Sequence, residues 1–410
     1  MGRLPLRLLA PALLLGALFL RPGFAAALFD AGELDALETE PLFDSEYFLD
    51  LRGFSYPMEW DELWADTPGV GYRVNSASLD RSDLFIEQEA RIPQRLNDWM
   101  AFRYDLEHRG DKDTVNLHNW INLIFGPFRN FTFALFGEPQ FAKEDADIGL
   151  RTAYAFGDKG SFYVGANAVD FNFNKRGRTT QRYDKRPYTY MLGGDLSLLG
   201  GSLSADAEFD TPLVRRVPDT NRIYKYRSSR LSLAWKGPLA GWNTRVGYVY
   251  GFKRESDNFS PDPLFKTLEF HRGVHMLSAV AGRPWGDKNL FEAGADLMMR
   301  RARADYPGAP LACSGYTRWE FMPYGRWRRE VKPWLTGEAA LFLSFGERRR
   351  IYDADAVVSE TDNVVEAKLG LGPDFVFAPG SRLALYATFD LDDAGRHIWD
   401  GGNIRAIFLF

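Results

Sequence analysis

The chain has 410 residues, 50 of them Lys or Arg and 55 Asp or Glu. The resulting formal net charge of −5 excludes a nucleic-acid-binding protein that depends on a basic surface. One cysteine, Cys313, excludes an internal disulfide, and the absence of any later run of 18 apolar residues excludes a helical membrane protein.

The first element is an export signal. "MGRLPLR" is basic, "LLAPALLLGALFL" is an apolar run of 13 residues, and small residues follow at Ala25 and Ala27. This order predicts a secretory signal peptide over residues 1–27, because the apolar run is shorter than the roughly 20 residues of a spanning helix. Residues 28–45 are acidic and short, and we expect a periplasmic N-terminal segment there. It is interpreted as a brief helix, a tail or a small insert into a lumen.

From Glu46 onward apolar and polar residues alternate, as in "SLSADAEFD" (202–210) and "RLALYATFDL" (382–391). Alternation with a period of two is typical of strands that have one apolar and one polar face. The pattern predicts eighteen strands, or sixteen if one hairpin is merged. They are expected at 46–57, 82–93, 97–108, 114–125, 129–138, 147–156, 161–174, 187–198, 202–211, 223–235, 241–253, 268–282, 289–302, 316–328, 334–346, 363–377, 381–391 and 403–410.

The connections alternate in length. Short turns such as "GDKG", "LLGG" and "APGS" alternate with longer segments, of which 58–81 and 346–362 are examples. A β-sandwich has no reason to sort its loops by end, whereas a transmembrane barrel has short periplasmic turns and longer outer loops. The sequence therefore predicts an all-β, antiparallel, up-and-down transmembrane barrel over residues 46–410. An even number of strands puts both termini on the periplasmic side.

The chain ends in "NIRAIFLF", with Ile404, Ala406, Phe408 and Phe410 on one strand face. This ending resembles the C-terminal signal of Gram-negative outer-membrane β-barrel proteins. The resemblance implies insertion by the barrel-insertion machinery and a location in the bacterial outer membrane. It also implies contact with membrane lipid and lipopolysaccharide.

A barrel of this size leaves an aqueous lumen unless something fills it. The polar strand faces then supply the candidate pore-lining residues, which are Asp195, Asp206, Glu208, Asp210, Arg230, Arg245, Asp296, Arg300, Arg318, Glu320, Arg326, Glu338, Lys368 and Arg405. Acidic and basic rows that face each other across a pore would create a transverse field that orients solutes. Ion pairs within one wall, which hold the barrel in shape, are the structural alternative.

No catalytic, cofactor or metal site is predicted. GxSxG, HExxH and Walker sequences are missing, and His271 and His275 lie about 13 Å apart along an expected strand. The sequence predicts a porin-like channel for small hydrophilic or charged solutes, and not an enzyme. Two alternatives stay open. One is a dedicated export channel for an anionic polysaccharide, which resembles the alginate exporter, and the other is a surface scaffold or adhesin closed by its loops.

Overall fold

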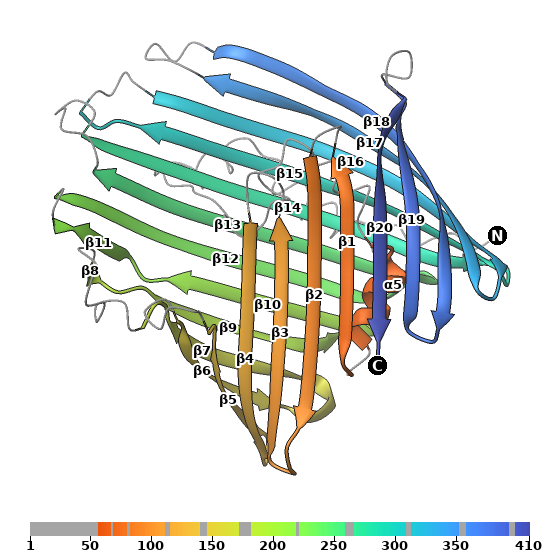
Figure 1. Ribbon diagram of the computed structural model, residues 1–410, viewed down its shortest axis with the longest axis horizontal. Coiled ribbons are helices and arrows are strands. Elements are labelled where there is room, and N and C mark those ends of the chain that lie inside the picture. The colour runs from red at the N-terminus through yellow and green to blue at the C-terminus, as the bar shows by residue number, and fades with distance from the viewer. Residues whose placement is uncertain are drawn as a thin grey trace.

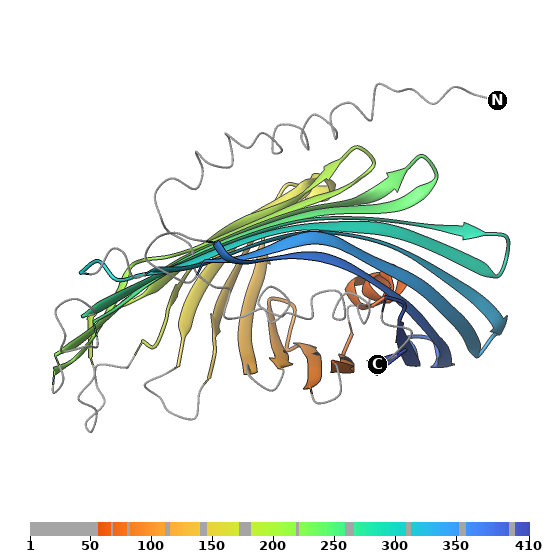
Figure 2. The ribbon, with the colours of Figure 1, turned by 90° about the horizontal axis from the view of Figure 1, so that it is seen from above.

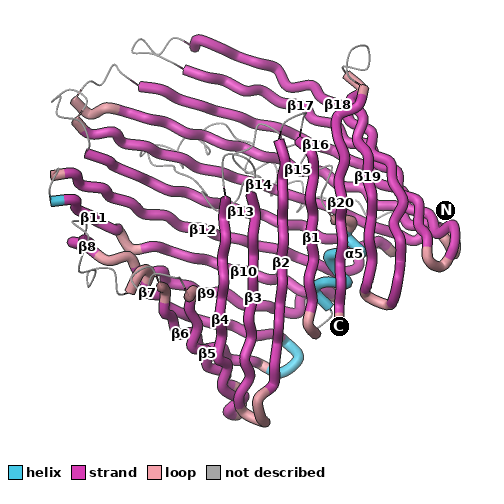
Figure 3. The backbone as a smooth tube through the Cα atoms, viewed as in Figure 1, coloured by secondary structure: helices cyan, strands magenta, loops and turns pink. Residues whose placement is uncertain are grey.

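The computed structural model describes residues 56–66, 69–79, 83–110, 115–139, 146–171, 182–218, 221–258, 266–308, 313–351, 358–392 and 398–410. Strands occupy nearly all of this length (Figure 3). The predicted signal peptide and the segment 28–45 lie outside the described residues. Within them, no helix is long and apolar enough to cross a membrane.

All strands belong to one antiparallel sheet that closes on itself where β1 pairs with β20. The strands are β1 (Gly71–Leu79), β2 (Asp83–Arg95), β3 (Met100–Gly110), β4 (Val115–Phe128), β5 (Phe131–Gly137), β6 (Ile148–Ala155), β7 (Gly160–Ala168), β8 (Arg182–Lys185), β9 (Tyr188–Leu198), β10 (Gly201–Asp210), β11 (Leu213–Val217), β12 (Arg222–Leu239), β13 (Trp242–Asn258), β14 (Thr267–Trp285), β15 (Asn289–Asp305), β16 (Cys313–Lys332), β17 (Leu335–Ile351), β18 (Val358–Ala378), β19 (Ser381–Asp390) and β20 (Trp399–Leu409).

Two of the barrel's strands are interrupted. Only residues 186–187 separate β8 from β9, only residues 211–212 separate β10 from β11, and β8 pairs with β11 as β9 pairs with β10. Counting each interrupted pair once, the sheet is an 18-stranded barrel, which confirms the predicted fold class and strand number. Figure 1 shows β1 to β4 nearly upright in front of the oblique strands β12 to β18, as expected for tilted strands on opposite walls.

The predicted first strand was wrong where the structure tests it. Residues 46–55 lie outside the described residues, and Tyr56 and Pro57 are not in a strand. The first strand of the barrel is β1, in a segment expected to be a long outer loop. That segment also contains the helix α5 (Met58–Asp66), which lies inside the curve of the wall (Figure 2).

Short turns gather at the end of the barrel where both β1 begins and β20 finishes. Two of them have two residues, Leu199–Gly200 and Ala240–Gly241, and all four residues have positive φ. Such turns match the twist of a hairpin and therefore allow a tight connection. At the opposite end the connections are less uniform than expected, since residues 80–82 and 111–114 already suffice there.

The strands β12 to β18 have 17–21 residues and are longer than the corresponding predicted ranges. Much of the segment 346–362, expected to be loop, continues β17 and β18. The loop prediction failed because these strand ends are charged on both faces. Alternation of apolar and polar residues ends where a strand leaves the membrane, although the sheet continues.

Large apolar side chains are exposed on the outer face, which is formed by every second residue along a strand. Leu150 is 66% exposed, Val365 66% and Ile404 50%. At the C-terminus, Arg405 and Ile407 point inward and are buried, as predicted. An apolar exterior on a closed barrel is stable only in lipid, and transmembrane barrels of this kind span bacterial outer membranes.

Candidate functional site

One half of the barrel interior is filled by side chains. Ala77 of β1 and Phe85 of β2 belong to one buried cluster with Met298, Met322 and Phe342, which come from β15, β16 and β17. Because these strands lie on opposite walls, the cluster bridges the interior (Figure 1). We call this side, lined by β14 to β20 with β1 and β2, the filled half.

Ion pairs accompany this cluster. Arg326 Nη1 lies 2.7 Å from Glu292 Oε1, Arg326 Nε lies 3.1 Å from Glu338 Oε1, and Arg405 Nη2 lies 3.0 Å from the same Glu338 oxygen. Arg318 pairs with Glu320, which is fully buried. Burial of such charges is tolerated only when each is paired and hydrogen-bonded. These residues therefore act as a buried scaffold of the filled half.

Helix α5 occupies the interior near the short turns. Its sequence, MEWDELWAD, puts Trp60, Leu63 and Trp64 at positions i, i+3 and i+4, so they share one face. Trp60 is 1% exposed and packs with Ala384 and Ile407 of the wall. The acidic residues occupy the remaining faces, and the backbone N–H groups of Trp60 and Asp61 donate to Pro57 O at the start of the helix.

Basic residues of the wall bind the acidic faces of α5. Glu59 pairs with Arg328 and, at 2.7 Å, with Arg382. Burial acts to raise the pKa of Glu59, but the guanidinium groups of Arg328 and Arg382 outweigh it and hold the pKa below its usual range. These contacts fix the helix as a charged insert against the filled half.

A second set of pairs reaches other strands. Asp61 accepts from Arg73 at 3.1 Å and from Arg245 at 3.2 Å, while Glu62 lies 3.7 Å from Lys236. The helix is thereby tied to β1, β12 and β13 as well as to β16 and β19. Because the helix lies inside the barrel, it takes up part of the lumen.

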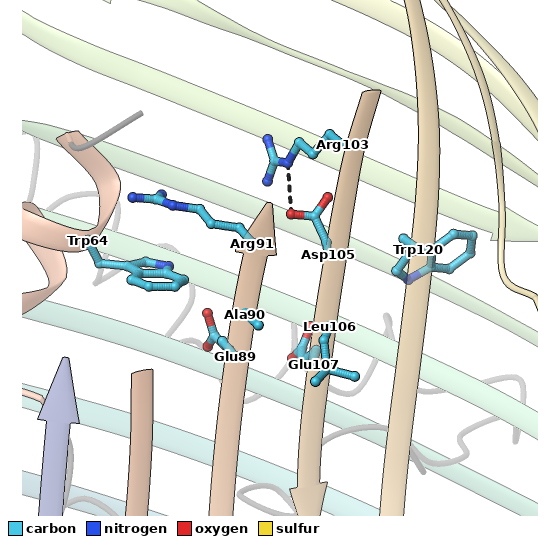
Figure 4. A pocket seen from close by; sticks show the side chains of 9 residues that line it. All are labelled: Trp64, Glu89, Ala90, Arg91, Arg103, Asp105, Leu106, Glu107 and Trp120. Atoms are coloured by element: carbon cyan, nitrogen blue, oxygen red, sulfur yellow. Dashed lines mark hydrogen bonds and ion pairs between the residues drawn. The ribbon is translucent and has the colours of Figure 1, made fainter. Parts of the chain in front are cut away.

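The other half of the interior keeps cavities along β3 to β10 and the part of β2 from Glu89 onward, and we call it the open half. One cavity of about 210 Å³ is lined by Trp64, Glu89, Ala90, Arg91, Arg103, Asp105, Leu106, Glu107 and Trp120 (Figure 4). A second of about 300 Å³ shares Arg103, Asp105 and Trp120 and adds Asn122, Ile124, Phe136, Arg151, Met191 and Glu208. The shared residues make the two cavities neighbours along one wall.

Both charge signs line this path. The Arg103 guanidinium donates to Asp105 at 2.7 Å, and the Arg91 guanidinium lies 4.3 Å from the ring centre of Trp64. In Figure 4, Trp64 on α5 and Trp120 on β4 stand on opposite sides of these charges. The charged lining of these cavities is therefore flanked by an aromatic side chain on either side.

The predicted pore-lining residues differ in their exposure. Seven are buried, namely Asp296, Arg318, Glu320, Arg326, Glu338, Lys368 and Arg405. Seven others are at least partly exposed, namely Asp195, Asp206, Glu208, Asp210, Arg230, Arg245 and Arg300. The burial of the first seven agrees with the alternative of ion pairs within the wall, because α5 and the buried cluster fill part of the interior.

Asp206, Glu208 and Asp210 lie at alternate positions on β10 and form an acidic row, two members of which have hydroxyl neighbours. Tyr163 donates to Asp206 at 2.5 Å and Thr189 donates to Asp210 at 2.7 Å, while Glu208 lies opposite Arg230 in the sheet. Hydroxyl donors relieve the repulsion between neighbouring carboxylates without cancelling their charge. The row keeps a negative character on the β10 wall.

The residues 59–64 were missed as site residues because the segment was interpreted as an outer loop. The helical spacing of Trp60, Leu63 and Trp64 within it, between two strand patterns, was the available signal. In the part of the chain that the structure describes, no group of three or more His, Cys, Asp or Glu is arranged to hold a metal ion.

No protein-family model matches the chain, and no curated protein matches it. Among solved structures, OmpT, an outer membrane protein of Vibrio cholerae, is 12% identical with a TM-score of 0.38, over 83% of this chain and 96% of that one. OccK11 (OpdR) of Pseudomonas aeruginosa is 11% identical with a TM-score of 0.37, over 83% and 93%. A bacterial polysaccharide outer membrane secretin is 9% identical with a TM-score of 0.36, over 83% and 98%.

The class of this protein follows from its own geometry. The pairing of β1 with β20 closes the sheet, and the exposed apolar rows make its exterior compatible only with lipid. The protein is a β-barrel of the bacterial outer membrane.

Proposed function

We propose that the protein is a passive channel for small hydrophilic solutes, and that the solutes move along the open half of the lumen. The observation that carries the proposal is the pair of neighbouring polar cavities that share Arg103, Asp105 and Trp120. Helix α5 limits the width of the path, which favours solutes of the size of single sugars or amino acids over polymers.

The mixture of charges supports small solutes of either sign. Arg103 and Arg151 line the same cavity as Asp105 and Glu208, so a solute meets both signs within one short stretch. An anionic polysaccharide would be attracted by a continuous basic path, which this lining does not supply. The porin-like function is therefore preferred to the polymer exporter. No catalytic role is assigned to any residue.

The proposal includes export of the chain by the predicted signal peptide. Cleavage of residues 1–27 and a periplasmic position for residues 28–45 would place α5 at the inner mouth of the channel. The short turns lie at the same end as β1's first residue and Phe410, in agreement with this orientation.

Planar-bilayer recording tests the channel directly. The refolded protein is expected to give discrete conductance steps, and Glu208→Gln is expected to shift the reversal potential in a salt gradient toward anions. Asp98→Asn, in an exposed turn, is the matched control and is expected to leave the reversal potential unchanged. A folded barrel that gives no steps would contradict the channel and favour the closed surface scaffold, for which α5 and the buried cluster are the structural argument.

A further inference from the structure

The outer face of β12 to β15 carries basic residues in register. Arg227 lies opposite Arg254, Arg254 lies opposite His271, and His271 lies opposite Arg303. Residues that lie directly opposite each other in an antiparallel sheet share a face, and the like charges of Arg227 and Arg254 therefore repel. His271 is buried in this row, with Nε2 3.5 Å from Glu269 Oε2. We call these four residues the basic row.

Two more cations extend the basic row. Arg301 lies two residues before Arg303 on β15, on the same strand face, and both are exposed. Lys225 lies two residues before Arg227 on β12 and is also exposed. The face carries two carboxylates here, because Glu269 lies 2.9 Å from Arg254 and Asp305 lies 2.8 Å from Arg303. The surface around the basic row thus keeps an excess of positive charge.

The basic row lies just beyond the apolar band of the outer face. Toward the short turns, the next row across the same strands is Ser229, Phe252, Gly273 and Arg301. It is followed by Leu231, Tyr250, His275 and Met299, and then by Leu233, Tyr248, Leu277 and Leu297. On β15 the outward positions from Phe291 to Met299 are all apolar and cover about 26 Å along the strand at the usual rise. A lipid-facing band is about 25 Å tall, so Arg301 and Arg303 stand at its outer edge.

Charge at this level meets lipid headgroups. Guanidinium groups bind phosphate in a bidentate manner and with strong charge-assisted hydrogen bonds. Phosphate would also relieve the repulsion within the basic row, which the two carboxylates offset only in part. The apolar rows directly beneath would contact the acyl chains of the same molecule.

From this geometry we propose that the basic row, with Arg301 and Lys225, is a binding site for the phosphorylated headgroup of an outer-leaflet glycolipid of the lipopolysaccharide type. The site lies on the lipid side of the wall. It is therefore separate from the lumenal path proposed above, and the channel and the lipid site can fail independently.

The test compares two double variants of the full chain, both refolded in detergent. Arg301→Gln/Arg303→Gln removes two cations from the site. Arg283→Gln/Arg329→Gln removes two exposed outward cations from the opposite rim of the same wall and is the matched control. Native mass spectrometry with bisphosphorylated lipid A measures binding, and circular dichroism with heat-dependent gel mobility confirms folding.

We expect lipid A to bind the wild type and the control with equal affinity, and to bind Arg301→Gln/Arg303→Gln at least tenfold more weakly. Dephosphorylated lipid A is expected to bind every variant, and the wild type, no more tightly than bisphosphorylated lipid A binds Arg301→Gln/Arg303→Gln. Equal affinity of all variants, or equal binding of the dephosphorylated lipid, would overturn the proposal. Displacement of lipid A by an equimolar amount of inorganic phosphate would identify a free-anion site instead and would overturn it as well.

Discussion

Arg405 of the last strand donates to Glu338 of β17 at 3.0 Å, although β18 and β19 separate these two strands in the sheet. The bond is therefore a chord through the barrel interior. Arg405 is 0% exposed, and its guanidinium also lies 4.7 Å from the ring centre of Tyr386. One half of the lumen is thus a packed polar core, and the proposed solute path runs through the other half.

The first prediction concerns this chord. Glu338→Gln leaves the buried cations of Arg326 and Arg405 without their shared carboxylate, and we expect a loss of about 3–5 kcal/mol in the free energy of unfolding. Reversible guanidinium unfolding of the refolded barrel measures it. The exposed pair Arg95–Asp98 supplies the control, since Arg95→Gln is expected to cause no measurable change. Equal losses of unfolding free energy in Glu338→Gln and Arg95→Gln would contradict a stabilising role of the buried ion pairs.

The second prediction concerns the width of the passage. Trp64 lines the cavity of the open half from α5, so Trp64→Ala is expected to raise single-channel conductance by about half or more. Trp99→Ala removes an equally large side chain from an exposed turn and is expected to leave the conductance unchanged. Unchanged conductance in Trp64→Ala would place the conducting path elsewhere.

The third prediction concerns pH and helix α5. The pKa of Glu59 is held below its ordinary value of 4.5, so its ion pairs stabilise the docked helix fully above that value. This stabilisation is lost as the pH falls below 4.5 through the lowered pKa. Hydrogen exchange of the amides of residues 58–66, corrected for intrinsic rates, is expected to show constant protection from pH 7 to 5 and weaker protection below pH 4.5.

Glu59→Gln is the matched variant for this experiment. It keeps the size of the side chain and removes the titrating group, so we expect lower protection at pH 7 and a flatter dependence on pH. A wild-type profile that is unchanged in Glu59→Gln would assign the pH dependence to other groups.

The fourth prediction separates lumenal from external charge. Arg103→Gln removes a cation from both cavities and is expected to shift the reversal potential toward cations. Arg303→Gln removes a cation from the lipid-facing side and is expected to leave the reversal potential within error of the wild type. A shift of equal size in both variants would show that the wall does not isolate the lumen from its outer surface charge.

The strand pattern was predictable because lipid-facing and lumenal positions alternate along most of each membrane-spanning strand. Phe209 and Ile404 are exposed and Arg405 is buried, as their alternation indicates. The filling of the lumen was not predictable in this way. Alternation assigns Glu208 and Glu338 to the same inner face, yet Glu208 lines a cavity while Glu338 is buried. That difference depends on which walls meet across the barrel, and such contacts leave no periodic signal.

Helix α5 was missed for a related reason. Nine residues are too few for a helix to be stable by itself, and its stability comes from the charges that surround it, such as Arg328 and Arg245. Those partners lie 269 and 184 residues away from Glu59 and Asp61 in the sequence. The number of strands was nevertheless right, because β1 took the place of the strand expected at 46–57.

Thiol accessibility tests the division of the lumen most directly. After Cys313→Ser, single cysteines are introduced in the open half at Asn122 or Glu208 and in the filled half at Ser344 or Met298, and each barrel is recorded before and after a small charged methanethiosulfonate reagent is added. We predict that the reagent reduces the current only in the first pair. Block of the current at Ser344 and Met298, or at none of the four positions in an open channel, would contradict the account.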